Sequence, residues 1–153
     1  MDIKELSENQ KNLISNVLDC LIPPDGVVIG AGEAGIVNYI CSAMSTSHDL
    51  NKAIRKIISV IQNASMTQYE SKFELLAQDN KIGILTYVEK IFPHYFEILV
   101  EHTYKGYYSN KDVLSLLGVG ATPPQPRGYI LSSFDKNMLK SVRRMGNKYR
   151  NQE

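Results

Sequence analysis

The sequence predicts an all-α fold: a single domain built as an irregular bundle of about six to seven helices. Apolar residues recur at intervals of three and four along most of the 153-residue chain, which is the period of one helix face. Prolines and capping residues separate these apolar stretches. A chain of this length suits one domain with a sizeable core, so we expect residues 1–153 to form one helical domain.

The first predicted helix begins at a capping box and ends at two prolines. Ser7 and Gln10 have the spacing at which each side chain binds the other residue's backbone N–H. The expected core face consists of Leu13, Ile14, Val17, Leu18, Leu21 and Ile22. Pro23 and Pro24 stop the helix because proline lacks a backbone N–H and its ring clashes with the preceding turn.

Two further helices follow before residue 62. The second is expected to start near Gly32 or Glu33, where an acidic side chain suits the helix dipole. Its core face is Ile36, Val37, Ile40, Cys41 and Met44. Asp49 is the expected N-cap of the third helix. Its inward residues are Leu50, Ala53, Ile54, Ile57, Ile58 and Ile61.

The middle of the chain predicts three more helical stretches. Thr67 and Glu70 have capping-box spacing, which predicts a helix start before Tyr69. That stretch carries Tyr69, Phe73, Leu76 and Ala77, and the next carries Ile84, Leu85, Val88 and Ile91. Pro93 is well placed in the first turn of the following helix. The apolar positions there are Phe96, Leu99, Val100, Thr103 and Tyr107.

The pattern weakens after Ser109. Residues 113–117 predict one or two helical turns. Residues 121–128 predict a long extended loop near the C-terminus, because three prolines and a glycine cannot continue a helix. Ser132 or Ser133 is expected to cap a last helix, so that residues 131–153 form a basic C-terminal helix or tail. Its apolar positions are Phe134, Met138, Leu139, Val142 and Met145.

A glycine-rich run imitates a dinucleotide-binding turn. Gly30, Gly32 and Gly35 have the spacing that lets a backbone approach a pyrophosphate at a helix N-terminus. Such a site needs a strand before the turn, but only residues 27–29 are left for one after the turn at 23–26. Asp49, at the right distance for the ribose contact, lies in a loop pattern. These surroundings favour a tight turn between two helices over a nucleotide site.

Composition and charge narrow the classes of function. The formal net charge is +1, so no overall field favours nucleic acid or a membrane surface. No apolar run approaches the roughly 20 residues of a membrane span. The N-terminus shows no export signal, so we expect a cytoplasmic protein. Cys20 and Cys41 fall on apolar helix faces, which predicts reduced buried thiols rather than a disulfide.

Few residues are candidates for catalysis. His94, Glu97 and Glu101 share one helix face and would serve a stand-alone metal-dependent enzyme, although a solvated face is the commoner outcome of such a pattern. His102 has no evident nucleophile beside it. We therefore expect no catalytic, cofactor-binding or metal-binding residue in this chain.

Aromatic and basic residues suggest contact with another macromolecule. The aromatic cluster is Tyr95, Phe96, Tyr104, Tyr107 and Tyr108. These rings are suited to stacking nucleobases. The favoured interpretation is that some of them belong to the core and others to a protein interface. The basic tail residues are Lys136, Lys140, Arg143, Arg144, Lys148 and Arg150. A nucleic-acid-binding helical module is therefore a second alternative, which the near-neutral charge disfavours.

Three segments in order resemble one known family. The first is Leu21-Ile22-Pro23-Pro24-Asp25-Gly26 followed by Gly30 to Ile36, and the second is Phe96 to Tyr108 with His102-Thr103 and Gly106-Tyr107-Tyr108-Ser109. The third is Leu117-Gly118, then Pro123-Pro124 and Arg127-Gly128-Tyr129. Together they are similar to the motifs of the gluconate 2-dehydrogenase subunit 3 family, over roughly residues 10 to 130.

This resemblance implies a small, helical, cofactor-free accessory subunit. Such subunits pair with a large FAD-dependent dehydrogenase of the glucose-methanol-choline type, and help it fold, stay soluble or be exported. The large subunit holds the FAD and oxidises sugars, sugar acids or related alcohols, and in many members a cytochrome c takes the electrons. No catalytic residues carry over to this chain.

Two departures from the family pattern affect these expectations. The twin-arginine export signal common in the family is not seen, which puts export and the cytochrome c partner in doubt. Residues 110–114 replace the family's glycine-asparagine stretch, so the interface there is expected to differ. The residues expected to contact the large subunit are Tyr104, Tyr107, Tyr108, Pro123, Pro124, Pro126, Arg127 and Tyr129.

Overall fold

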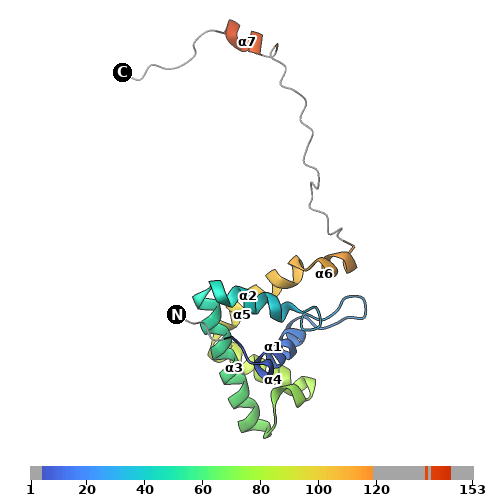
Figure 1. The fold of residues 1–153 in the computed structure, drawn as a ribbon, viewed down its shortest axis with the longest axis vertical. Coiled ribbons are helices and arrows are strands. Elements are labelled where there is room, and N and C mark those ends of the chain that lie inside the picture. Colours follow the sequence, from blue (N-terminus) through green and yellow to red (C-terminus); the bar gives the residue numbers. More distant parts are fainter. Residues whose placement is uncertain (1–4, 119–136, 138, 146–153) are drawn as a thin grey trace, which may run out of the picture. The chain divides into compact units, whose positions relative to one another are not determined.

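Every regular element of the described residues is a helix, which confirms the all-α prediction. The computed structural model describes residues 5–118, 137 and 139–145. The order is α1 (Glu8–Leu21), α2 (Ile36–Thr46), α3 (His48–Tyr69), the 3₁₀ helix η1 (Phe73–Leu75), α4 (Gln78–Ile91), α5 (Pro93–Ser109), α6 (Lys111–Leu116) and α7 (Leu139–Arg144) (Figure 1). The predicted proline-rich loop at 121–128 lies outside the described residues.

The chain divides into two compact units, Met1–Ala121 and Thr122–Glu153. The first unit holds α1 to α6, and the second holds the short helix α7. The expectation of a single domain over 1–153 stays a prediction.

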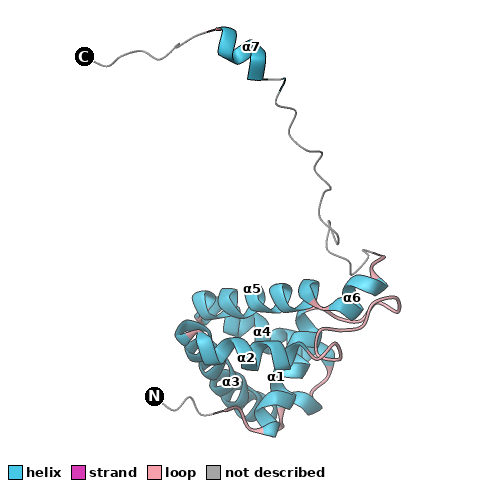
Figure 2. Cartoon of the chain, turned by 45° about the horizontal axis from the view of Figure 1, so that its top comes forward, coloured by secondary structure: helices cyan, strands magenta, loops and turns pink. Residues whose placement is uncertain are grey.

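The long helix α3 is the centre of the first unit. It packs against α1, α2, α4, α5 and η1, while α2 and α5 run side by side next to it (Figure 2). Its buried face includes all six residues predicted from the spacing: Leu50, Ala53, Ile54, Ile57, Ile58 and Ile61. Burying these apolar side chains is the main stabilising contribution of the helix, because propensity alone rarely holds an isolated helix together.

Helix α1 has the predicted start and stop. The Ser7 N–H donates to Gln10 Oε1 over 3.0 Å, and the Gln10 N–H donates to Ser7 Oγ over 3.4 Å, which completes the capping box. The helix ends at Leu21, just before the two prolines. Leu13, Ile14, Val17 and Leu18 are buried, whereas Leu21 and Ile22 are half-buried against the core.

Two predicted helix starts are wrong by a few residues. Helix α2 begins at Ile36 rather than near Gly32 or Glu33, because residues 31–35 form turns that end at Gly35 in the left-handed region, with φ of 72°. The N-cap of α3 is Ser47 rather than Asp49. Ser47 has an extended backbone and its hydroxyl accepts from the Leu50 N–H over 3.3 Å, which leaves Asp49 in the first turn.

The helix start predicted at Thr67 is also wrong. Helix α3 continues through Thr67 to Tyr69, and Glu70 is its C-cap with a left-handed φ of 51°. The buried face extends this far because Ala64 and Ser65 lie under neighbouring elements, and the Ser65 hydroxyl donates to the Ile61 carbonyl over 2.8 Å. The segment that follows contains only the short helix η1, which buries Phe73.

Helices α4 to α6 follow the predicted pattern closely. Pro93 stands at the start of α5, and Phe96, Leu99, Thr103 and Tyr107 are buried. The Thr103 hydroxyl donates to the Leu99 carbonyl over 2.7 Å, which satisfies this buried polar group. Ile91 is the exception to the predicted core face of α4, because it is exposed at the C-terminal end of the helix.

Candidate functional site

The glycine-rich turn between α1 and α2 packs directly on α1. The Gly32 N–H donates to Asp19 Oδ1 over 2.8 Å. A Cβ atom at Gly32 would collide with the Ser15 carbonyl oxygen and would lie 2.5 Å from Asp19 Oδ2. A Cβ atom at Gly30 would collide with the Asp19 carboxylate as well. The two glycines therefore allow the chain to approach α1 at a distance that no side chain would permit.

The same contacts leave no phosphate cradle in this turn. A pyrophosphate site needs several free backbone N–H groups at the start of the helix. Here Asp19 occupies the Gly32 N–H, and the Ala34 and Gly35 N–H groups donate to the carbonyls of Gly30 and Gly32. The Asp19 carboxylate would also repel a phosphate. These contacts support the interpretation of residues 27–35 as a packed interhelical turn.

Helix α5 holds the other side of this turn. The Tyr107 hydroxyl donates to the Ile29 carbonyl over 2.7 Å, and the Asn110 side-chain amide donates to the Ala34 carbonyl over 3.0 Å. Burial raises the pKa of Tyr107, which keeps its hydroxyl protonated as a donor. Tyr107 is only 3% exposed, so the structure places this predicted partner residue in the core.

We expect Tyr107→Phe to lower the free energy of unfolding by about 0.5–1.5 kcal/mol, the usual net contribution of one hydrogen bond. The change leaves the buried ring in place and removes only the donor to Ile29. Urea denaturation would measure the difference. The matched control is Tyr104→Phe, whose hydroxyl has no hydrogen bond within the described residues. Equal losses in the two variants would contradict this assignment.

The neighbouring tyrosines form an exposed aromatic surface on α5, which we call the tyrosine platform and define as Tyr104 and Tyr108. Their rings stack with centroids 6.0 Å apart and an interplanar angle of 4°. Tyr108 also meets the Tyr107 ring edge-on, at 5.3 Å and 88°. Tyr104 is 45% exposed and Tyr108 52% exposed. The buried Tyr107 thus contacts Tyr108, and Tyr108 stacks on Tyr104.

Other apolar side chains are exposed at the same end of this unit. Leu116 and Leu117 lie exposed at the end of α6, which packs against α5. Val27 is exposed in the turn at residues 25–28, and the loop that carries it lies beside α6 (Figures 1 and 2). The Asp25 carboxylate accepts from the N–H groups of Val27 and Val28, and these bonds lower the pKa of Asp25. The turn is therefore preorganised at neutral pH.

The remaining predicted partner residues are Pro123, Pro124, Pro126, Arg127 and Tyr129, and all lie outside the described residues. Sequence reasoning missed Asp19 and Asn110, which hold the glycine-rich turn. Asp19 contacts a residue 13 positions away, and Asn110 contacts one 76 positions away. In the sequence, the only sign of this packed turn is a run of glycines between two helices. Such a run does not show which residues bond to the turn.

One residue of the candidate metal face forms an ion pair along the helix. Glu101 forms an ion pair with Lys105 at 2.6 Å, which lowers the pKa of this exposed carboxylate. His94 is exposed at the start of α5, with its ring against Tyr95 at 5.9 Å. No group of three or more His, Cys, Asp or Glu residues in the described part of the chain is placed to hold a metal ion.

The remaining candidates for catalysis, one histidine and two cysteines, are partly buried in the helical unit. His102 is half-buried with Nδ1 enclosed and unpartnered, and burial lowers its pKa. Cys20 and Cys41 are free in the structure, and both are half-buried rather than fully buried as predicted. Burial raises the pKa of both thiols and makes them poor nucleophiles at neutral pH.

The basic tail is described only in part. Lys140 and Arg144 lie in α7, whereas Lys136, Lys148 and Arg150 fall outside the described residues. The nucleic-acid alternative therefore stays a prediction. None of the helices that the structure describes combines the length and the apolar character required to cross a membrane.

Comparison with known proteins identifies the family. No curated protein and no solved structure matches the chain. The family model of gluconate 2-dehydrogenase subunit 3 matches residues 8–115. The matched region runs from the start of α1 into α6, and it includes the glycine-rich turn, Tyr107 and the tyrosine platform. The chain therefore belongs to the gluconate 2-dehydrogenase subunit 3 family.

Proposed function

We propose that this chain is a non-catalytic accessory subunit that binds and stabilises a large FAD-dependent oxidoreductase. The partner would act on sugars, sugar acids or related alcohols, and it would hold the FAD. The observation that carries this proposal is the family match over residues 8–115, because the family consists of subunits of a dehydrogenase. This chain would supply contact surface to the complex and no cofactor ligand.

The tyrosine platform is the described surface best suited to that partner. Tyrosine is enriched in protein interfaces because its ring buries apolar area while its hydroxyl bonds to polar groups. The two rings stack on each other, and the Tyr108 ring also meets the Tyr107 ring edge-on, so the pair is already ordered. A preordered contact loses less side-chain entropy on binding, which favours affinity. The other residues expected from the sequence to contact the partner, Pro123, Pro124, Pro126, Arg127 and Tyr129, lie outside the described residues and stay a prediction.

Co-expression with the large subunit tests the proposal directly. We expect the two chains to purify together as a yellow complex whose absorbance shows bound flavin. We also expect a higher soluble yield of the large subunit than when it is expressed alone. A large subunit that is equally soluble and active without this chain would contradict the proposal.

A double substitution, Tyr104→Ser with Tyr108→Ser, tests where the partner binds. We expect the affinity for the large subunit to fall by about tenfold or more, since exposed tyrosines at an interface often contribute over 1 kcal/mol each. The fold should persist because both side chains are exposed. Binding would be measured by titration and folding by circular dichroism.

The control for that experiment is the pair Tyr69→Ser and Tyr87→Ser, which removes two exposed tyrosines from α3 and α4. We expect this variant to bind almost normally. If both double variants weaken binding equally, the platform is not the specific contact.

A further inference from the structure

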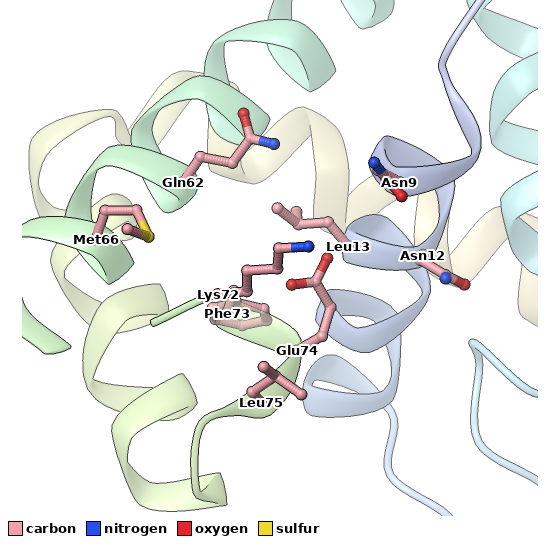
Figure 3. A pocket seen from close by; sticks show the side chains of 9 residues that line it. All are labelled: Asn9, Asn12, Leu13, Gln62, Met66, Lys72, Phe73, Glu74 and Leu75. Carbon is pink, nitrogen blue, oxygen red and sulfur yellow. The ribbon is translucent and has the colours of Figure 1, made fainter. Parts of the chain in front are cut away.

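A second surface feature lies between α1, α3 and η1, where a cavity of about 470 Å³ opens (Figure 3). This volume falls within the usual range for sites that bind small molecules. The first turns of α1, the C-terminal half of α3 and the whole of η1 contribute its walls. The tyrosine platform shares no residue with this cavity.

Three side-chain amides line the cavity. Asn9 and Asn12 come from α1, and Gln62 comes from α3. Each amide offers a carbonyl acceptor and an NH₂ donor, the same pair of groups that a peptide backbone presents. No hydrogen bond within the described residues occupies any of these three amides. They are therefore free to pair with an extended main chain.

Two opposite charges face the same space. Figure 3 shows the Lys72 ammonium and the Glu74 carboxylate both pointing into the cavity. Neither forms an ion pair with another residue of the described chain. One cation and one anion give the cavity no net charge, so it selects neither an anionic nor a cationic ligand. A neutral chain of peptide dipoles complements this arrangement, with carbonyls toward Lys72 and N–H groups toward Glu74.

Apolar groups complete the cavity. Leu13 and Phe73 are buried beneath it. Met66 and Leu75 also line it, and these side chains are exposed, with exposed fractions of 54% and 76%. Exposed side chains of this size provide contacts for an apolar side chain of a guest, and methionine adapts readily to different shapes. A sugar would instead favour an open aromatic face for stacking, but Phe73 is only 1% exposed. The lining therefore favours a peptide over a carbohydrate.

We propose that this cavity binds an extended segment of the large subunit through its main chain and at least one apolar side chain. This inference rests on the proposed function, and it adds a second contact that is separate from the tyrosine platform. The amides would pair with the backbone of the segment, and Met66 and Leu75 would cover its apolar side chain.

The test uses the full chain and the large subunit. Leu75→Glu places a charge where the apolar anchor would lie, and Gln62→Ala removes one of the amides. We expect Leu75→Glu to weaken the complex by about tenfold and Gln62→Ala by a smaller factor. Both side chains are exposed, so circular dichroism and the melting temperature should stay close to those of the unmodified chain. The matched control is Ile82→Glu, an exposed apolar residue on α4.

A photo-crosslinking residue at position 75 identifies the occupant. We expect mass spectrometry to find one short segment of the large subunit attached to it. Normal affinity of Leu75→Glu, with no crosslink, would overturn the cavity proposal and leave the proposed function standing if the tyrosine variant still binds weakly. No complex with the unmodified chain would refute both. A rise in melting temperature with D-gluconate alone, abolished by Gln62→Ala, would assign the cavity to a sugar acid instead.

Discussion

Gly32→Ala is expected to lower the free energy of unfolding by about 3 kcal/mol, from overpacking and a disturbed charge-assisted hydrogen bond. The added methyl group would collide with the Ser15 carbonyl oxygen, which belongs to the backbone of α1 and cannot rotate away. It would also crowd Asp19 Oδ2 at 2.5 Å. The turn would have to move off α1, and the bond from the Gly32 N–H to Asp19 would lengthen or break.

Urea denaturation at neutral pH would measure this loss, with Gly83→Ala as the matched control. Gly83 lies within α4, and a Cβ atom there would meet nothing within 4 Å. Alanine should therefore stabilise the control by about 0.5–1 kcal/mol, because it favours the helix more than glycine does. Similar shifts in both variants would mean that close packing is not the role of Gly32.

The same experiment distinguishes packing from nucleotide binding in the glycine-rich run. If the run serves to pack the turn, Gly32→Ala changes stability and has no direct effect on flavin. A variant that kept its stability but lost flavin bound by this chain alone would support the nucleotide interpretation that the hydrogen bonds of the turn argue against.

The second large effect is expected at Phe73→Ala, which should lower the free energy of unfolding by about 3–5 kcal/mol. Phe73 is only 1% exposed and is the buried residue of η1, the short helix that packs on both α1 and α3. Removing its ring leaves a cavity at this junction and also takes away the ring near the Lys81 ammonium, which lies 5.8 Å from its centroid. Neighbouring backbone can fill such a space only in part.

Leu75→Ala provides the control within the same 3₁₀ helix. Leu75 is 76% exposed, so its truncation should change the stability by no more than about 0.5 kcal/mol. Both variants would be compared by denaturation with urea. A loss of less than about 1 kcal/mol at Phe73 would show that η1 is only loosely attached to the first unit.

Most helices of the first unit could be predicted from the sequence because their apolar stripes are long and regular. All six predicted inward residues from Leu50 to Ile61 are buried, and Pro93 starts α5 as expected. Helix ends were less predictable. Ser47 and Asp49 are both good N-caps, and Thr67 with Glu70 has capping-box spacing although it lies at the end of α3. In these cases the burial of neighbouring residues decided which of the possible capping residues ends the helix.

The candidate sites show the same division. The tyrosines of α5 could be recognised as interface candidates from composition. The helical spacing also placed Tyr107 on the apolar face, and the structure buries it and leaves Tyr104 and Tyr108 exposed. The cavity was not predictable, because its amides and charges are ordinary polar residues on three separate elements. Only their packing brings Asn9, Gln62 and Glu74 to one space.

The sequence by itself determined the helical class, most of the buried faces and the family, because periodicity and motif order are properties of neighbouring residues along the chain. The tertiary structure decided the role of the glycine-rich turn. Its partners are Asp19 on one side and Tyr107 on the other, and the hydrogen bond from Tyr107 spans 78 positions. Such contacts depend on how whole helices pack, so a local pattern of residues does not predict them.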